Sequence, residues 1–286
     1  MLEFAREILS PQFLFRHALA GTLLLGMTAP FAGCFLVARR QSFLGVTLPQ
    51  VSSTGLASGL FLASFWHREG ATHEIFALLG ALVFTLATLF FLSWFAREKR
   101  SIGDAWQGAL YIGAGAATVL LLSCNPHTGH GLNGILRGEI VSISSYEFWL
   151  GSPFLILPVG LLVLFSHEFA LASYDPDFAR AIGQCTVFWD TLLFILIGLI
   201  IATAVFMAGP LVCFGMMLLP ALGGRLQGRT LGQIFLISAL LGIIAALGGF
   251  LAAYKLDLPT GPTIIVCEFA LLALSFGIHL ARGNFA

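Results

Sequence analysis

Long apolar segments recur along almost the whole chain, and they constrain the fold more than any other feature. They fall at roughly 17–38, 43–65, 74–96, 105–123, 147–166, 186–208, 210–222, 231–253 and 261–281. Most are long enough to cross a hydrocarbon core of about 30 Å as helices rising about 1.5 Å per residue. The pattern predicts an all-α fold, a polytopic integral membrane bundle of about eight to nine transmembrane helices.

Composition excludes the main alternative, a soluble fold. The chain is 58% hydrophobic and only 10% charged, whereas soluble domains carry about 25% charged residues. The apolar segments occupy nearly all of the 286 residues, so we expect a single transmembrane domain over 1–286 and no attached soluble domain. Basic and acidic residues number 14 each, which argues against nucleic acid as a partner.

Two places depart from a simple series of spans. The apolar run 186–222 is too long for one crossing, and Gly209-Pro210 divides it. Its second half is short and is expected to end at Pro220 as a broken or partly re-entrant helix. The stretch 132–145 is apolar but too short to span, which predicts a re-entrant or interfacial piece lying against protein or a water-filled path.

The placement of basic residues predicts an orientation. With nine crossings and an outside N-terminus, the outer side receives five basic residues, Arg6, Arg16, Arg68, Arg137 and Lys255. The cytoplasmic side receives nine, namely Arg39, Arg40, Arg97, Lys99, Arg100, Arg180, Arg225, Arg229 and Arg282. Since cytoplasmic loops are enriched in Lys and Arg, this orientation is favoured over its inverse.

Polar residues interrupt the second apolar segment. Gln50, Ser53, Thr54 and Ala57 recur at the spacing of one helical face. One interpretation is a helix–helix contact, where small and hydroxylated residues let two backbones approach. The other is a face that lines a transport path.

Two acidic residues lie within membrane-embedded sequence. Glu268 is about 10 Å into the last segment, where a bare carboxylate costs about 2.5–3.5 kcal/mol on insertion scales. It must therefore face the interior of the bundle, carry a partner or be protonated. Its role is either in a translocation path or in a structural hydrogen bond. Glu139 lies beside Arg137 in the 132–145 stretch, where it either contributes to the path or pairs with that arginine.

The loop after the fourth segment carries potential metal ligands. Cys124, His127 and His130 follow one another at three-residue spacing, and thiolate and imidazole groups bind zinc and similar metals. The alternative for His127 and His130 is an ordinary polar turn on the outer side.

No signature of ATP hydrolysis is present in the sequence. The only two lysines are Lys99 and Lys255, and neither follows a glycine-rich phosphate-binding pattern. This chain therefore cannot by itself hydrolyse ATP by that mechanism.

Five motifs in order, covering nearly the whole chain, together resemble the ABC-3 metal-importer permeases, which serve zinc and manganese uptake. They are RRQSFLG at 39–45, LRGE at 136–139, DPDFARAIG at 175–183, GPLV with LLPA at 209–221, and DLPTGP at 257–262.

This resemblance implies a multi-pass protein of the bacterial plasma (inner) membrane that acts as a homodimer or paired permease. It implies a transport subunit and not an enzyme, with ATP hydrolysis expected on a separate chain. It implies a cytoplasmic ABC ATPase and an extracytoplasmic metal-binding protein as partners, no cofactor bound by this chain, and a metal ion as cargo. It also implies that the segment with Asp175, Asp177, Ala179, Arg180 and Gly183 docks into the ATPase. Local chemistry alone explains part of this segment, because Asp175 before Pro176 is a typical helix start.

The chain departs from the family pattern where metal contacts are expected. After Gly45 the family usually carries an acid and, four residues later, a histidine, but this chain has Val46 and Gln50. Gln50 offers a carbonyl oxygen and no imidazole. A transition metal would then draw ligands from elsewhere, such as His127, His130, Glu139 and Glu268, or the cargo differs.

Three hypotheses follow. The first is a permease for a divalent metal ion in an ABC importer. The second keeps the permease and changes the cargo to a metal chelate of the siderophore or cobalamin type. The third is a secondary transporter without an ATPase, in which Glu268 couples to protons.

Overall fold

The computed structural model describes residues 15–65, 71–96, 103–124, 140 and 143–282. Within these ranges the long helices are α2 (Arg16–Ala38), α3 (Leu44–Phe65), α4 (Ala71–Ala96), α5 (Gly103–Ser123), α7 (Ser145–Leu164), α10 (Thr186–Gln227), α11 (Leu231–Leu256) and α12 (Thr260–Ala281). Two short helices, α8 (Ser166–Tyr174) and α9 (Pro176–Ala181), join α7 to α10. The predicted helical bundle is confirmed, and the predicted span limits differ by only a few residues for most helices.

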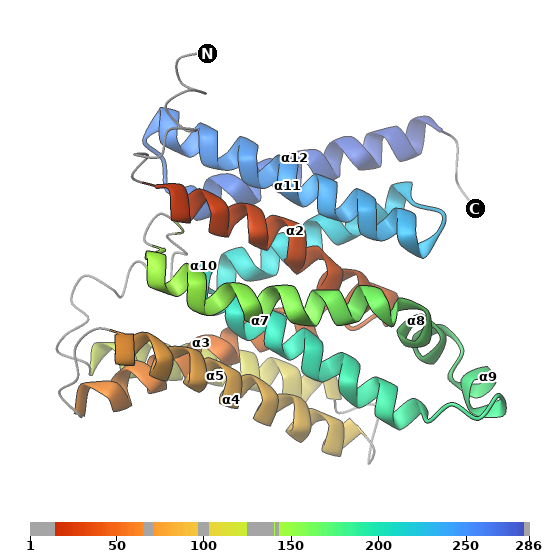
Figure 1. The fold of residues 1–286 in the computed structure, drawn as a ribbon, viewed down its shortest axis with the longest axis horizontal. Helices are drawn as coiled ribbons and strands as arrows, with labels where there is room; N and C mark the ends of the chain where they lie inside the picture. The colour runs from red at the N-terminus through yellow and green to blue at the C-terminus, as the bar shows by residue number, and fades with distance from the viewer. Residues whose placement is uncertain (1–14, 66–70, 97–102, 125–139, 141–142, 283–286) are drawn as a thin grey trace.

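The long helices lie side by side, with α8 and α9 at one end of the bundle (Figure 1). Helix α10 is central and packs against α2, α3, α4, α7, α11 and α12, whereas α5 contacts mainly α3. In the most apolar stretch of α10, 72% of the residues are buried, against 11% in α5. Helix α5 therefore lies at the periphery of this chain.

Helix α10 is two helices joined at Gly209. This glycine has φ 76° and ψ 167°, a conformation that residues with a Cβ rarely adopt. The second half folds back on the first. The evidence is that the thiol of Cys213 lies only 3.8 Å from the carbonyl oxygen of Ile201, twelve residues earlier. The break that the sequence predicts at Gly209-Pro210 is confirmed.

The predicted end of this second half at Pro220 is wrong. The helix continues through Pro220 to Gln227, so that it is about 27 Å long at about 1.5 Å per residue. A proline removes one backbone donor, but neighbouring helices make this tolerable inside a membrane bundle. The fold-back thus returns the chain to the end of the bundle from which α10 started.

Counting α10 twice, nine segments of the described chain run along the bundle. Seven described helices, α10 among them, are long and apolar enough to cross a membrane. Helix α3 adds a further 22-residue helix, which is less apolar because of its polar residues Gln50 to Thr54. The predicted eight to nine crossings agree with this arrangement. The predicted re-entrant stretch 132–145 lies almost entirely outside the described residues.

The basic residues that the structure describes separate between the two ends of the bundle. Arg39 pairs with Asp190 at the start of α10, and Arg282 donates to Gln227 at its end, so both halves of α10 meet α2 and α12 at one end. Phe15 packs on Tyr254 at the opposite end, beside Arg16 and Lys255. The described cations are therefore arranged as the predicted orientation requires.

Candidate translocation and coupling sites

The polar face of α3 meets α5. The hydroxyl of Thr54 lies 2.8 Å from the carbonyl oxygen of Ala114 and 2.9 Å from the hydroxyl of Thr118. Gln50 lies against Gly115, where an added Cβ would come within 3.1 Å of its Nε2. Thr54 therefore makes a helix–helix contact of the kind that the sequence suggested as one interpretation of this face, and Gln50 lies beside it.

Two serines of α3 are buried without a hydrogen-bond partner. Ser52 and Ser53 each have a relative exposure of 0%, and neither side-chain oxygen has a partner. Buried hydroxyls without partners are costly and uncommon in native structures. These two oxygens are therefore open to a ligand or a conformational rearrangement.

Glu268 is buried in α12 and faces α10. Its exposure is 2%, and a Cβ added at Gly215 would lie 3.5 Å from its Oε2. Neither carboxylate oxygen has a hydrogen-bond partner. The glycine leaves the carboxylate next to the backbone of the returning half of α10, and no cation of the described part of the chain pairs with it.

The returning half of α10 lies between α3 and Glu268. Gly215 faces the α12 carboxylate, while Phe214 and Met217 contact Gly45 near the start of α3. The structure brings Gln50 and Thr54 together and sets Glu268 on the other side of α10. No group of three or more His, Cys, Asp or Glu residues that could hold a metal occurs within the described ranges.

Three predicted site residues cannot be placed. His127, His130 and Glu139 lie outside the described residues. The predicted metal contacts of the two histidines and the predicted path role of Glu139 therefore remain predictions.

The predicted coupling segment forms the short helix α9, at the end of the bundle that the charge pattern predicts to be cytoplasmic. Asp175 caps it by accepting from the N–H of Phe178 at 2.9 Å, as the sequence suggested. Asp177 and Arg180 pair on its exposed surface at 3.3 Å, and Ala179 is fully buried beneath them.

Gly183 ends α9. It has φ 85°, and the N–H groups of Gly183 and Gln184 donate to the carbonyls of Arg180 and Ala179. This hydrogen-bond pattern is a Schellman motif, in which glycine is the preferred left-handed residue. The local sequence thus builds a capped helix with a sharp exit.

The structure adds apolar residues to this surface that the sequence did not single out. Tyr174, Phe178 and Ile182 are each more than half exposed, although α9 lies beyond the ends of the spanning helices. Exposed apolar side chains gathered at one end of the bundle favour a protein contact surface. Their regular four-residue spacing was a signal available in the sequence.

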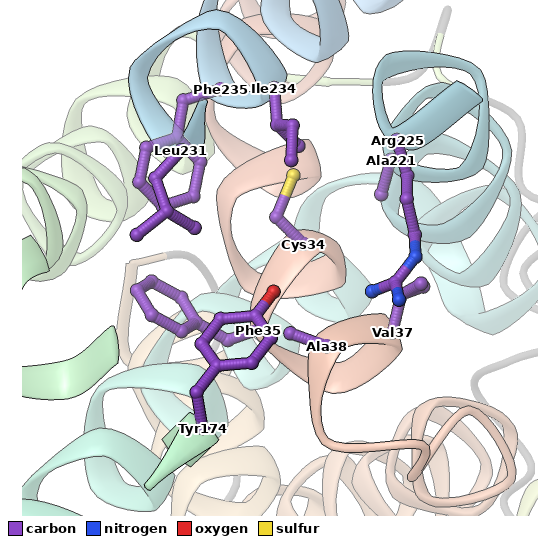
Figure 2. A pocket seen from close by; sticks show the side chains of 10 residues that line it. All are labelled: Cys34, Phe35, Val37, Ala38, Tyr174, Ala221, Arg225, Leu231, Ile234 and Phe235. Atoms are coloured by element: carbon purple, nitrogen blue, oxygen red, sulfur yellow. The ribbon is translucent and has the colours of Figure 1, made fainter. Parts of the chain in front are cut away.

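A pocket at the same end does not resemble a cation path. Figure 2 shows it between α2, Tyr174 of α8, the returning half of α10 and the start of α11. Apart from the Arg225 guanidinium, its lining is mostly apolar: Cys34, Phe35, Val37, Ala38, Tyr174, Ala221, Leu231, Ile234 and Phe235. A positive charge in an otherwise uncharged lining disfavours a metal cation.

Comparison with known proteins shows the family. The chain matches the ABC 3 transport family over residues 11–279. The manganese import system permease protein ScaB of Streptococcus gordonii is 25% identical over 276 residues, which cover 96% of this chain and 95% of the relative. The manganese transport system membrane protein MntC of Halalkalibacterium halodurans is 24% identical, with 98% of this chain and 92% of the relative covered.

Solved structures share the fold. A chain of PsaBC from Streptococcus pneumoniae, solved in complex with Fab, has a TM-score of 0.81 at 21% identity and covers 96% of this chain and 95% of its own length. An inward-facing putative metal-chelate type ABC transporter has a TM-score of 0.71 at 18% identity and covers 93% and 85%. With its apolar helices and a family match over nearly its whole length, this chain belongs to the ABC 3 transport family and is a multi-pass transport subunit of the bacterial plasma membrane.

Proposed function

We propose that this chain is the permease subunit of an importer for a divalent metal ion of the manganese class, driven by a separate ATPase that docks on α9. The observation that carries the proposal is similarity along the full length to permeases named for manganese import, with more than 90% of both chains covered.

The shape and chemistry of α9 support docking to a soluble partner. A short, well-capped helix presents Phe178 and Ile182 beside the Asp177–Arg180 pair, at the end of the bundle that carries most described basic residues. A mixed surface of apolar anchors and charges is typical of transient protein interfaces. The buried Ala179 lets this helix lie close to its neighbours.

The donor atoms support a hard cation. Gln50 offers an amide oxygen, Ser53 a hydroxyl and Glu268 a carboxylate without a partner. Oxygen ligands suit manganese, whereas imidazole and thiolate favour zinc. In this proposal, Gln50 and Ser53 contact the cargo on one side of α10, and Glu268 contacts it on the other during the transport cycle.

The remaining partners follow from the same proposal. A second permease, either another copy of this chain or a paired subunit, completes the membrane unit. An extracytoplasmic metal-binding protein delivers the ion to the end of the bundle where α2 begins and α11 ends.

Binding to the ATPase tests the coupling part. We expect the double variant Asp177→Lys, Gly183→Leu to lower the affinity of the purified permease for its ATPase by at least about tenfold, because it reverses a surface charge and strains the helix exit. Glu168→Lys on the neighbouring helix α8 is the matched control and should bind normally. Equal binding by both variants would refute docking on α9.

Uptake into proteoliposomes tests the cargo. With ATPase, ATP and the metal-binding protein present, excess Mn²⁺ should compete with radiolabelled Mn²⁺ more effectively than Zn²⁺ does. Competition by a metal chelate but not by free ions would identify a chelate as cargo. Uptake driven by a proton gradient without ATP would instead favour a secondary transporter.

A further inference from the structure

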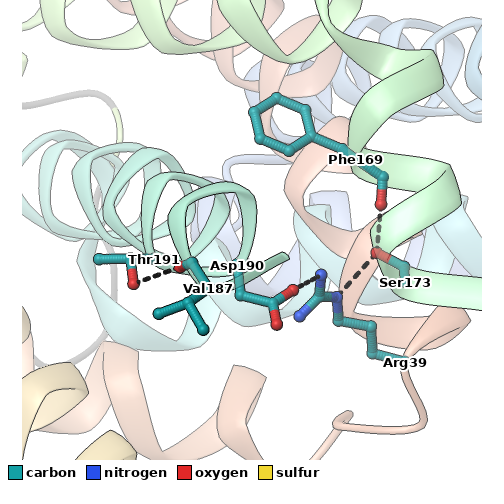
Figure 3. A network of polar contacts seen from close by, with 6 residues as sticks. All are labelled: Arg39, Phe169, Ser173, Val187, Asp190 and Thr191. Atoms are coloured by element: carbon teal, nitrogen blue, oxygen red, sulfur yellow. Dashed lines mark hydrogen bonds and ion pairs between the residues drawn. The ribbon is translucent and has the colours of Figure 1, made fainter. Parts of the chain in front are cut away.

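Arg39 joins three helices at the cytoplasmic end. Its Nη2 donates to the Asp190 carboxylate of α10 at 2.6 Å, and its Nε donates to the Ser173 hydroxyl of α8 at 2.8 Å. The Ser173 hydroxyl donates in turn to the carbonyl oxygen of Phe169. Figure 3 shows this network between α2, α8 and α10.

The two partners of Arg39 flank the coupling helix on both sides. Ser173 lies two residues before Asp175, the N-cap of α9, and Asp190 lies in the first turns of α10, which follows the exit at Gly183. Helix α9 itself packs mainly on α8 and α10. Its position on the bundle is therefore set chiefly through the two flanks that Arg39 ties together.

Arg39 is itself held rigidly. Its side chain is only 11% exposed, and its guanidinium lies over the Phe194 ring at 5.3 Å. It caps the C-terminus of α2, where Arg40 and Gln41 donate to the carbonyls of Val37 and Leu36 in a second Schellman motif. After this tight turn α3 begins at Leu44, so Arg39 is close in the chain to the helix that carries Gln50 and Ser53.

We infer that Arg39 is the positioning residue that clamps both flanks of α9 to the α2–α3 turn, so that a displacement of α9 is transmitted to α3. The role as a transmitter rests on the proposed docking of the ATPase, whereas the clamp is a property of this chain alone. An arginine is required because its planar fork reaches a carboxylate and a hydroxyl at once; a lysine is a point charge that retains only the carboxylate.

Hydrogen exchange in the full chain tests the clamp without any ATPase. In Arg39→Ala we expect amide exchange in peptides covering 166–190 to be about tenfold faster, because the loss of charge-assisted hydrogen bonds favours local opening. In Arg39→Lys only the α8 side should exchange faster, since the lysine still reaches Asp190. Arg229→Ala, which removes an exposed arginine at the same end, should match the native chain. Native exchange in Arg39→Ala would overturn the inference.

Transport by the assembled complex tests the transmission. We expect Arg39→Ala to bind the ATPase within about twofold of native affinity, but to move several-fold less metal per ATP hydrolysed, with Arg39→Lys intermediate. An unchanged ratio of metal to ATP would overturn the transmission. If the native chain does not bind the ATPase at all, the proposed function fails, and the exchange experiment still decides whether the clamp exists.

Discussion

The polar groups at the end of the bundle next to α9 differ from those in the middle of the bundle. At the end, Arg39, Asp190 and Ser173 satisfy one another within one network. In the middle, Ser52, Ser53 and Glu268 are buried and their side-chain oxygens have no partner. The first set is expected to stabilise the fold, whereas the second costs stability, which agrees with the transport role proposed above for Ser53 and Glu268.

The largest effect is expected from Glu268→Gln, which tests the buried carboxylate in the middle of the bundle. We expect metal uptake to fall at least about tenfold while the thermal unfolding temperature in detergent rises, because the amide removes the cost of a buried carboxylate without a partner. Both quantities are measured on the same purified protein. Cys267→Ala, at the neighbouring position of α12, is the control and should change neither. Native uptake combined with lower stability would make Glu268 a structural residue.

A double-mutant cycle tests whether the contact between Arg39 and Asp190 stabilises the protein. Arg39→Met and Asp190→Asn should each destabilise the protein, and the pair should show a coupling energy of about 1–2 kcal/mol, as expected of a partly buried charge-assisted contact. The free energies come from reversible unfolding in detergent. Glu168→Gln serves as the control and is expected to change stability by less than about 0.5 kcal/mol. Strict additivity of the two changes would show that the contact contributes nothing.

Helix α3 carries both kinds of hydroxyl group: Thr54 has hydrogen bonds to α5, and Ser52 has no partner. Thr54→Val should destabilise the protein by about 0.6–1 kcal/mol, because Thr54 loses its hydrogen bonds to α5. Ser52→Ala should leave the unfolding temperature unchanged or raise it, since its hydroxyl has no partner to lose. Equal losses of stability in the two variants would show that the hydroxyl of Ser52 is satisfied as well.

The smallest effect is expected at Arg40, next to the clamp. Arg40 has φ 58°, and a left-handed conformation costs a residue with a Cβ about 1–2 kcal/mol. Arg40→Gly should therefore stabilise the turn slightly, by about 0.5 kcal/mol once the greater freedom of an unfolded glycine is counted. Thermal unfolding measures this, and the exchange of α9 should stay native. A loss of stability would mean that the Arg40 side chain also takes part in holding this end together.

Local sequence predicted much of the fold. The span limits could be read because the length of a crossing helix follows from the thickness of the bilayer. The break at Gly209-Pro210 and the cap of α9 at Asp175 were also predictable, since glycine, proline and aspartate act within a few residues of themselves. The continuation past Pro220 was not predictable, because it depends on packing by neighbouring helices.

Contacts across the bundle could not be predicted from the sequence. Arg39 was noted for its charge and its motif, but nothing local links it to Asp190, 151 positions away. The partner of the polar face of α3, helix α5, was equally hidden. Lipid tails and the protein interior are both apolar, so periodicity cannot tell a lipid-facing side from a buried one.

By itself, the sequence determined that this chain crosses the membrane repeatedly, where most helices begin and end, and which end carries the positive charge. Those properties depend on hydrophobicity and charge summed over short stretches. Only the tertiary structure decided that α10 folds back on itself, that Arg39 joins both flanks of α9, and that Glu268 lies buried against Gly215 without a partner. These depend on which surfaces meet, and in an apolar solvent that choice is made by close packing and hydrogen bonding between distant residues.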